Sequence, residues 1–208
     1  MTRKLLLTLL FSATFILAGQ ITTIYNTGVD GSGGLAATGS TDLHYTLTTI
    51  LGPNTYVEKH PAWLADGPNS KWIAPTLDAC LGCSTGTYIY HTTFDLTGFD
   101  PSTAVLVGKW STDDSGLNIV LNGVSTGNTA GGYGAFYDFT ISSGFIAGVN
   151  TLDFSVANGG GSWTGLRVEF TSATADPRNG GGGIPEPGTM TLLGLGLAAL
   201  AIYRRRGR

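Results

Sequence analysis

The sequence predicts an all-β protein built as an antiparallel β-sandwich. Short segments in which apolar and polar residues alternate recur along the chain, as expected for strands with one buried face. Glycine accounts for 32 of the 208 residues, and Gly-rich turns separate these segments. The strands do not alternate with helical patterns, which excludes the nucleotide-binding α/β folds. A body of about 160 residues between the two terminal segments suits one domain.

Eight segments are predicted as strands. In chain order they are residues 21–25, 44–51, 88–96, 103–111, 117–121, 136–141, 151–157 and 165–171. The clearest alternation is in 88–96, where every second residue from Tyr88 faces the same side. In the last segment Leu166 and Val168 face one way, while Arg167 and Glu169 face the other.

The dipeptide Asn122-Gly123 directly follows the strand predicted at 117–121. Asn-Gly tolerates the positive φ angles of a two-residue turn, so it predicts a tight hairpin at this point. Trp110 lies within a predicted strand and is expected in the core. Trp63 and Trp72 are expected to pack the Pro-rich segment 61–75 onto the sheet.

The N-terminus has the organisation of a secretory signal peptide. Arg3 and Lys4 precede an apolar run at 5–17, and the small residues Ala18 and Gly19 follow. This order predicts export, with cleavage after Ala18 or Gly19 and a signal peptide covering residues 1–19. The alternative is a permanent membrane anchor, for which the apolar run is short.

The C-terminus combines three features in a fixed order. Pro185, Glu186 and Pro187 precede an uncharged run at 189–203, and a basic cluster ends the chain. The cluster consists of Arg204, Arg205, Arg206 and Arg208. As a helix the run is about 22 Å long, so it spans a bilayer core of about 30 Å only with local thinning or snorkelling ends. The basic cluster suits the cytoplasmic face.

This tail resembles the PEP-CTERM sorting signal of Gram-negative bacteria, which a membrane transpeptidase of the exosortase type reads. The resemblance implies that exosortase is a partner and cuts at or near residues 185–187. It also implies an inner-membrane intermediate held by the C-terminal helix, followed by release to the cell surface or extracellular matrix. The predicted organisation is therefore a signal peptide (1–19), a β-sandwich domain (20–175), a Gly-rich linker (176–183) and a sorting signal (184–208).

The charge of the exported body differs from that of the whole chain. Residues 21–183 contain five basic and 13 acidic side chains, a formal charge of −8, whereas the full chain has −3. An acidic body without a basic stripe argues against binding to nucleic acid or anionic lipid.

A second resemblance concerns the fold. The run 110–123, in which Asp113 and Asp114 precede a strand ending in Leu121-Asn122-Gly123, resembles the central hairpin of galactose-binding-like jelly rolls. Residues 150–170 are similar to their closing strands, and the resemblance covers about residues 86–172. It implies a jelly-roll sandwich without a catalytic motif. Such folds often hold a structural calcium ion in an early loop, which leaves calcium open for the loop at Asp30, although EF-hand spacing is missing.

The two cysteines, Cys80 and Cys83, are predicted to form a disulfide, because exported proteins meet oxidising conditions. A zinc site would need two further ligands that the three histidines do not supply at a suitable spacing. A redox role would need a βαβ setting. Residues 82–86 match the nucleophile-elbow pattern around Ser84, but no strand precedes and no helix follows them, so we predict no nucleophile there.

Trp163 is the main candidate for ligand binding, because it lies in the Gly-rich segment 158–164 and sugars stack on exposed aromatic rings. Asp113, Asp114 and Asn158 would supply hydrogen bonds to sugar hydroxyls. The alternatives are that Trp163 folds back as a lid over the sandwich end, and that the two carboxylates satisfy turn amides. Tyr133 is another aromatic residue expected in an exposed loop.

Together these observations predict an exported, non-enzymatic protein of the surface or extracellular matrix, sorted by exosortase and associated with exopolysaccharide or biofilm. The alternative is a specific carbohydrate-binding module that uses loop aromatics and carboxylates. A glycosidase has the least support, because its paired carboxylates must flank one bond, whereas adjacent residues of a strand face opposite ways.

Overall fold

The computed structural model describes residues 18–48 and 51–178. Residues 1–17 of the predicted signal peptide, the sorting motif and the C-terminal helix therefore lie outside the described residues. The described part contains eleven strands and one 3-10 turn, Pro101–Thr103. The strands are β1 (Gly19–Gln20), β2 (Thr41–Leu47), β3 (Asn54–Val57), β4 (Ile73–Ala74), β5 (Gly86–Asp95), β6 (Val105–Asp113), β7 (Ser115–Leu121), β8 (Val124–Ser125), β9 (Tyr137–Ile141), β10 (Val149–Asn158) and β11 (Gly165–Ala175).

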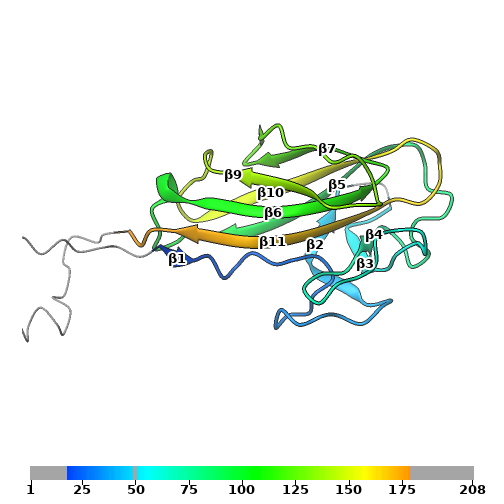
Figure 1. Cartoon of the computed structure of the whole chain (residues 1–208), viewed down its shortest axis with the longest axis horizontal. Coiled ribbons are helices and arrows are strands. Elements are labelled where there is room, and N and C mark those ends of the chain that lie inside the picture. Colours follow the sequence, from blue (N-terminus) through cyan, green and yellow to red (C-terminus); the bar gives the residue numbers. More distant parts are fainter. Residues whose placement is uncertain (1–17, 49–50, 179–208) are drawn as a thin grey trace, which may run out of the picture. The chain divides into compact units, whose positions relative to one another are not determined.

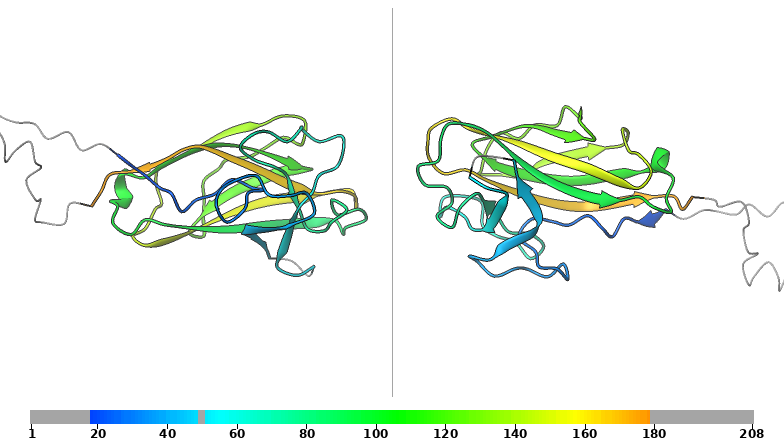
Figure 2. Two further views of the ribbon diagram at one scale, coloured as in Figure 1. Left: turned by 90° about the horizontal axis from the view of Figure 1, so that it is seen from below. Right: turned by 180° about the vertical axis from the view of Figure 1, so that it is seen from behind.

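The strands form one curled antiparallel sheet with the order β8-β7-β10-β5-β2-β3-β4-β11-β6-β9, and β1 pairs with β11. The short strands β3 and β4 join two larger halves, which face each other (Figures 1 and 2). The prediction of an all-β antiparallel fold is confirmed, and the curled sheet is consistent with a β-sandwich.

The core lies between the two halves of the sheet. Phe154 on β10 packs against Trp110 on β6 and Phe139 on β9, with ring centroids 5.7 and 6.3 Å apart. All three side chains are buried. Because burying apolar surface is the main favourable term in folding, these contacts across the interior hold the halves together, and the prediction that Trp110 lies in the core is confirmed.

The predicted hairpin at Asn122-Gly123 is confirmed. The two residues have φ angles of 50° and 79°, and the turn pairs Val120 of β7 with Ser125 of β8. The predicted strands at 88–96, 103–111, 117–121, 136–141, 151–157 and 165–171 correspond to β5, β6, β7, β9, β10 and β11. The segment predicted at 44–51 overlaps β2, which begins earlier, at Thr41.

The strand predicted at 21–25 is wrong. Pairing with β11 continues only to Ile21, whose N–H donates to the carbonyl of Ala173 at 2.8 Å. Beyond it the main chain finds partners other than a neighbouring strand: the carbonyl of Tyr25 accepts from the hydroxyl of Tyr45 at 2.9 Å. The segment therefore bows away from β11, which creates a pocket described below.

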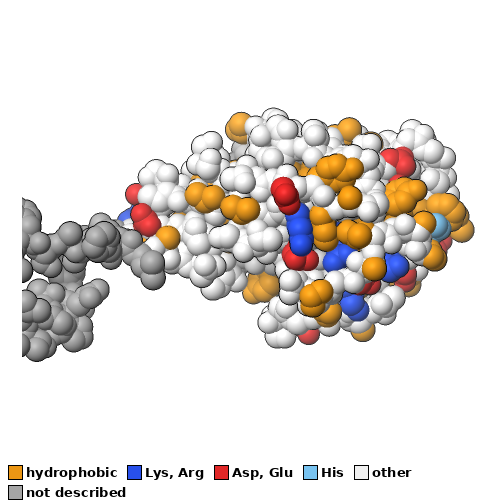
Figure 3. Space-filling model, in the orientation of Figure 1, with side chains coloured by type: hydrophobic (Ala, Val, Ile, Leu, Met, Phe, Trp, Pro, Cys, Tyr) orange, Lys and Arg blue, Asp and Glu red, His pale blue; other side chains and the backbone are white. Residues whose placement is uncertain are grey.

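The outer face of β11 carries a buried ionic cluster. Arg167 and Glu169 are 2% and 7% exposed, because the segment 58–72 covers them. The Arg167 Nε–H donates to Ser70 Oγ at 2.9 Å, and the Ser70 hydroxyl donates to Glu169 Oε2 at 3.0 Å. Lys109 on β6 forms a salt bridge of 3.1 Å with Glu169. Figure 3 shows a short line of charged atoms across the middle of this face.

This cluster explains how the Pro-rich segment is held on the sheet. Arg167 also donates from Nη1 to the carbonyl of Ala65 within the segment. Burial opposes ionisation of Glu169, but hydrogen bonds from Lys109, Asn69 and Ser70 outweigh it and lower the pKa of this carboxyl. A charge-assisted network of this kind is satisfied only when segment 58–72 lies in one position.

Candidate binding surfaces

Asp113 and Asp114 lie where β6 passes into β7, and both carboxylates have partners within the protein. Asp113 is buried, and its Oδ2 accepts from the Trp63 indole N–H at 2.6 Å. Asp114 Oδ2 accepts from the Gly159 N–H at 2.6 Å. The Gly159 contact agrees with the alternative in which a carboxylate satisfies a loop amide. Sugar binding by these groups stays a prediction.

Burial has an electrostatic consequence at Asp113. Desolvation, together with the neighbouring Asp114, raises the pKa of its carboxyl to about 6, against the hydrogen bond from Trp63, which lowers it. Asp113 therefore changes charge in a mildly acidic range, at a point that anchors the segment 58–72 through Trp63.

Asn158 ends β10 and is 1% exposed. Its Nδ2 lies 3.3 Å from three carbonyl oxygens, those of Cys83, Ser84 and Ser162. The amide therefore joins the loop after the cysteines to the Gly-rich loop after β10. In this position Asn158 organises the loops around Trp163, whereas its predicted contact with sugar remains untested.

Trp163 is half-buried and packs against an aromatic cluster at this end of the domain. Its ring lies 4.1 Å from that of His60, between centroids. Trp63 and Trp72, both buried, are 4.6 Å apart and form the centre of the cluster. This packing agrees with the lid alternative for Trp163 and with the expectation that Trp63 and Trp72 fix the Pro-rich segment. Tyr133 is 43% exposed, as expected for a loop residue.

A disulfide joins Cys80 to Cys83, with Cα atoms 5.2 Å apart. The loop that it closes lies beside the start of β11, since Thr164 N–H donates to the carbonyl of Ala79 at 3.2 Å. Leu77 and Leu81 are largely exposed around it and line an open hollow.

The predicted calcium loop is organised by its own carboxylate. Asp30 Oδ1 accepts from the N–H and the hydroxyl of Ser32, at 2.9 and 2.7 Å, and from the N–H of Gly34 at 3.0 Å. These hydrogen bonds lower the pKa of Asp30. Within residues 18–48 and 51–178, no group of three or more His, Cys, Asp or Glu side chains is arranged to hold a metal ion.

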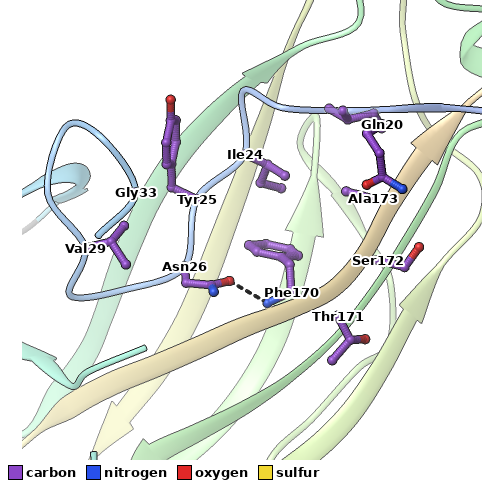
Figure 4. A pocket seen from close by; sticks show the side chains of 11 residues that line it. Gln20, Ile24, Tyr25, Asn26, Val29, Gly33, Phe170, Thr171, Ser172 and Ala173 are labelled. Atoms are coloured by element: carbon purple, nitrogen blue, oxygen red, sulfur yellow. Dashed lines mark hydrogen bonds between the residues drawn. The ribbon is translucent and has the colours of Figure 1, made fainter. Parts of the chain in front are cut away.

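A separate pocket lies between β11 and the bowed segment 21–26, and we call it the β11 pocket (Figure 4). Its volume is about 290 Å³. Most of the residues that line it come from these two chain segments, and they include Gln20, Ile24, Tyr25, Asn26, Phe170 and Ser172. A register shift in the β6–β11 pairing between Phe170 and Ser172 marks a β-bulge beside the pocket. Bulges of this kind re-aim side chains and are frequent next to binding sites.

Both ends of the bowed segment are fixed on β11. At one end Gln20 pairs with Thr174. At the other end the Asn26 Oδ1 accepts from the Phe170 N–H at 2.7 Å, and its Nδ2 donates to the carbonyl of Asn69 at 2.9 Å. Within the described residues, contacts with β11 therefore hold the pocket at both ends of segment 21–26. The pocket was missed at the sequence level, because 21–25 has the composition of a strand and its partner residues lie about 145 positions further on.

The described molecule is an all-β domain with acidic and aromatic loops at one end and a pocket beside the edge of β11. In a comparison with known protein families, residues 183–206 match the PEP-CTERM protein-sorting motif. This match confirms the predicted sorting signal. It supports an exported protein that is an exosortase substrate and passes through a membrane-anchored intermediate.

The comparison with curated proteins finds no match. The comparison with solved structures finds none either. In the part of the chain that the structure describes, no helix has the length and apolar character needed to cross a membrane. The helix predicted at 189–203 lies outside that part.

Proposed function

We propose that this protein is an exported, non-enzymatic component of the cell surface or extracellular matrix that associates with exopolysaccharide. The observation that carries the proposal is the PEP-CTERM motif at 183–206. An N-terminal signal peptide at 1–19 would start export, and exosortase would remove the C-terminal helix. The folded domain would then remain outside the cytoplasm.

Two features of the domain support a role without catalysis. The adjacent carboxylates Asp113 and Asp114, which could serve as an acid–base pair, are each held by a short hydrogen bond from Trp63 and Gly159. General acid–base catalysis needs groups that reach the substrate proton directly or through one water. The acidic body also favours solubility in an aqueous matrix over adhesion to anionic lipid.

Cell fractionation tests this proposal. Replacement of Pro185, Glu186 and Pro187 by alanine should trap the uncleaved protein in the membrane, whereas the wild type should appear in the surface or matrix fraction at a lower mass. Pro177→Ala, outside the motif, is the matched control. Release of the triple variant at wild-type mass, or absence of the wild type from exopolysaccharide pellets, would contradict the proposal.

We also propose that the domain is a galactose-binding-like jelly roll, as the resemblance of residues 110–123 suggests. The hairpin expected there is wrong, because β6 pairs with β11 and β9 whereas β7 pairs with β10 and β8. The support is the confirmed turn at Asn122-Gly123 and the passage of β6 into β7 at Asp113 and Asp114. An experimental structure in which the strand order differs from that of a jelly roll would reject this assignment.

Carbohydrate recognition at the loop end is the second candidate function. The half-buried ring of Trp163, next to His60, favours it because one aromatic surface remains accessible at the domain end. A glycan array should then show binding by the wild type and its loss in Trp163→Ala. Equal binding by both proteins would exclude Trp163 as the recognition residue.

A further inference from the structure

We propose that the β11 pocket binds one neutral sugar ring of a polysaccharide. This inference rests on the proposed association with exopolysaccharide, and it places the contact beside the edge of β11 rather than at Trp163. It follows from the shape of the pocket, its charge, and the polar groups that remain available in it.

The size and rigidity of the pocket fit a small ligand. Its volume of about 290 Å³ is just below the range of about 300 to 1,000 Å³ that is usual for ligand pockets, so it suits a single small ring. The walls are held by strand pairing at Gln20 and by the two hydrogen bonds of Asn26. A preformed site binds at a smaller entropic cost than one that must be ordered first.

The chemistry of the walls selects an uncharged ligand. The described side chains that line the pocket are all uncharged, which disfavours a ligand whose charge would need an ionic side-chain partner. Phe170 supplies an aromatic ring and Ile24 an aliphatic side chain, whereas the Tyr25 ring points away from Phe170 (Figure 4). Tyr25 is fixed by stacking on His44 at 3.7 Å between ring centroids. A mixed apolar and amide lining suits the C–H faces and hydroxyls of a pyranose.

Hydrogen-bonding groups are available where the ligand would lie. Among the described residues, the side chains of Gln20 and Ser172 make no hydrogen bond within the protein. In Figure 4 the Gln20 amide extends from the N-terminal segment toward β11. The Asn26 amide is already oriented and keeps one N–H free, since an amide nitrogen carries two donors. Neutral sugars present several hydroxyls that can both donate and accept, and these amide and hydroxyl groups can serve them.

Saturation-transfer NMR with the exported protein tests the inference. The probes are methyl glycosides of glucose, galactose, mannose and N-acetylglucosamine. We expect at least one to bind the wild type, and Gln20→Ala/Ser172→Ala to weaken its affinity about tenfold or more, because two ligand hydrogen bonds are lost. Ser143→Ala, an exposed serine outside the pocket, and Trp163→Ala should bind like the wild type.

The inference is overturned if no glycoside binds, or if the double variant binds as tightly as the wild type while its melting temperature is unchanged. Sedimentation with exopolysaccharide separates this outcome from failure of the proposed function. If wild type and double variant pellet equally, matrix association stands and the pocket assignment is wrong. If the wild type does not pellet, the proposed association with exopolysaccharide is wrong. The NMR measurement with glycosides then decides separately whether the β11 pocket binds a sugar.

Discussion

The two halves of β11 have different surroundings. At Arg167 and Glu169 the segment 58–72 covers the strand closely through a network of buried charges. From Phe170 onward the segment 21–26 runs along the edge of the strand and leaves a cavity between the two. We call the part of β11 at Arg167 and Glu169, which segment 58–72 covers, the sealed half, and the part from Phe170 onward, which lies beside the β11 pocket, the hollow half. The difference shows that polar contacts set the position of a covering segment, and that the spacing of its anchors decides whether space remains beneath it.

Of the substitutions considered, replacement of Arg167 in the sealed half should lower the free energy of unfolding most. Arg167→Ala leaves Glu169 buried with Lys109 as its remaining ionic partner and deprives Ser70 and Ala65 of a donor. Breaking a buried ion pair from one side costs about 3–5 kcal/mol. Chemical denaturation should show this loss in the free energy of unfolding.

Arg178→Ala is the matched control, because Arg178 is exposed at the end of the described domain. Its free energy of unfolding should change by less than about 0.5 kcal/mol. An equally small change in Arg167→Ala would show that the segment 58–72 is held by its aromatic contacts alone.

Asp113 provides a pH-dependent test of the second anchor of the same segment. Its pKa is about 6 in the folded protein, against an ordinary value of 3.8. Because the folded state holds the proton more tightly, the contribution of Asp113 to stability is full below about pH 4 and is lost as the pH rises to about 6. The loss amounts to at most about 3 kcal/mol.

Asp113→Asn should abolish this pH dependence and make the protein more stable than the wild type at pH 7, since the amide oxygen can still accept from Trp63. Melting curves from pH 4 to pH 7 measure both effects. Parallel wild-type and variant curves over this range would show that Asp113 does not titrate there.

The boundary between the two halves depends on Asn26. Asn26→Ala removes the acceptor of the Phe170 N–H and the contact with Asn69, and it leaves a partly buried N–H unpaired. We expect a loss of about 1–3 kcal/mol in the free energy of unfolding. Hydrogen exchange should also become faster at the Phe170 amide. Unchanged exchange there would mean that water or another group replaces the side chain.

Substitutions in the hollow half should change the free energy of unfolding least. Gln20→Ala and Ser172→Ala alter side chains without hydrogen bonds inside the described protein, so each should change the free energy of unfolding by less than about 0.5 kcal/mol. A loss of more than 1 kcal/mol in either variant would show that the pocket walls contribute to the fold, and the contrast between the halves would be smaller than proposed.

Most of the fold could be predicted from the sequence because strand alternation and turn chemistry are local signals. The alternation around Tyr88 and Tyr90 and the dipeptide Asn122-Gly123 need no knowledge of distant residues. The strands β3 and β4, of four and two residues, are too short to show a period, and they were missed. The segment at 21–25 has strand composition, but its neighbours decide that it bows away.

The sites were less accessible to sequence reasoning. The sorting motif is a contiguous pattern, and it was identified directly. The indole bond of Trp63 to Asp113 and the amide contact of Asn158 with Cys83 join residues that are 50 and 75 positions apart. Likewise, alternation placed Arg167 and Glu169 on the face opposite Leu166, but no local pattern indicates that another segment buries that face. Contacts of this kind become visible only when the chain has folded.

The pairing of Gly19 with Ala175 has a consequence for how the domain would stand at a surface. The first and last described residues leave the domain side by side, while Ala79 of the disulfide loop lies at the opposite end of β11, about 33 Å away for eleven residues. A membrane attachment at either terminus would therefore hold the domain by the same end, the one at which Gly19 pairs with Ala175. The exposed leucines and Trp163 would point outward in both cases, so trimming one end before the other would not reverse the side offered to the surroundings.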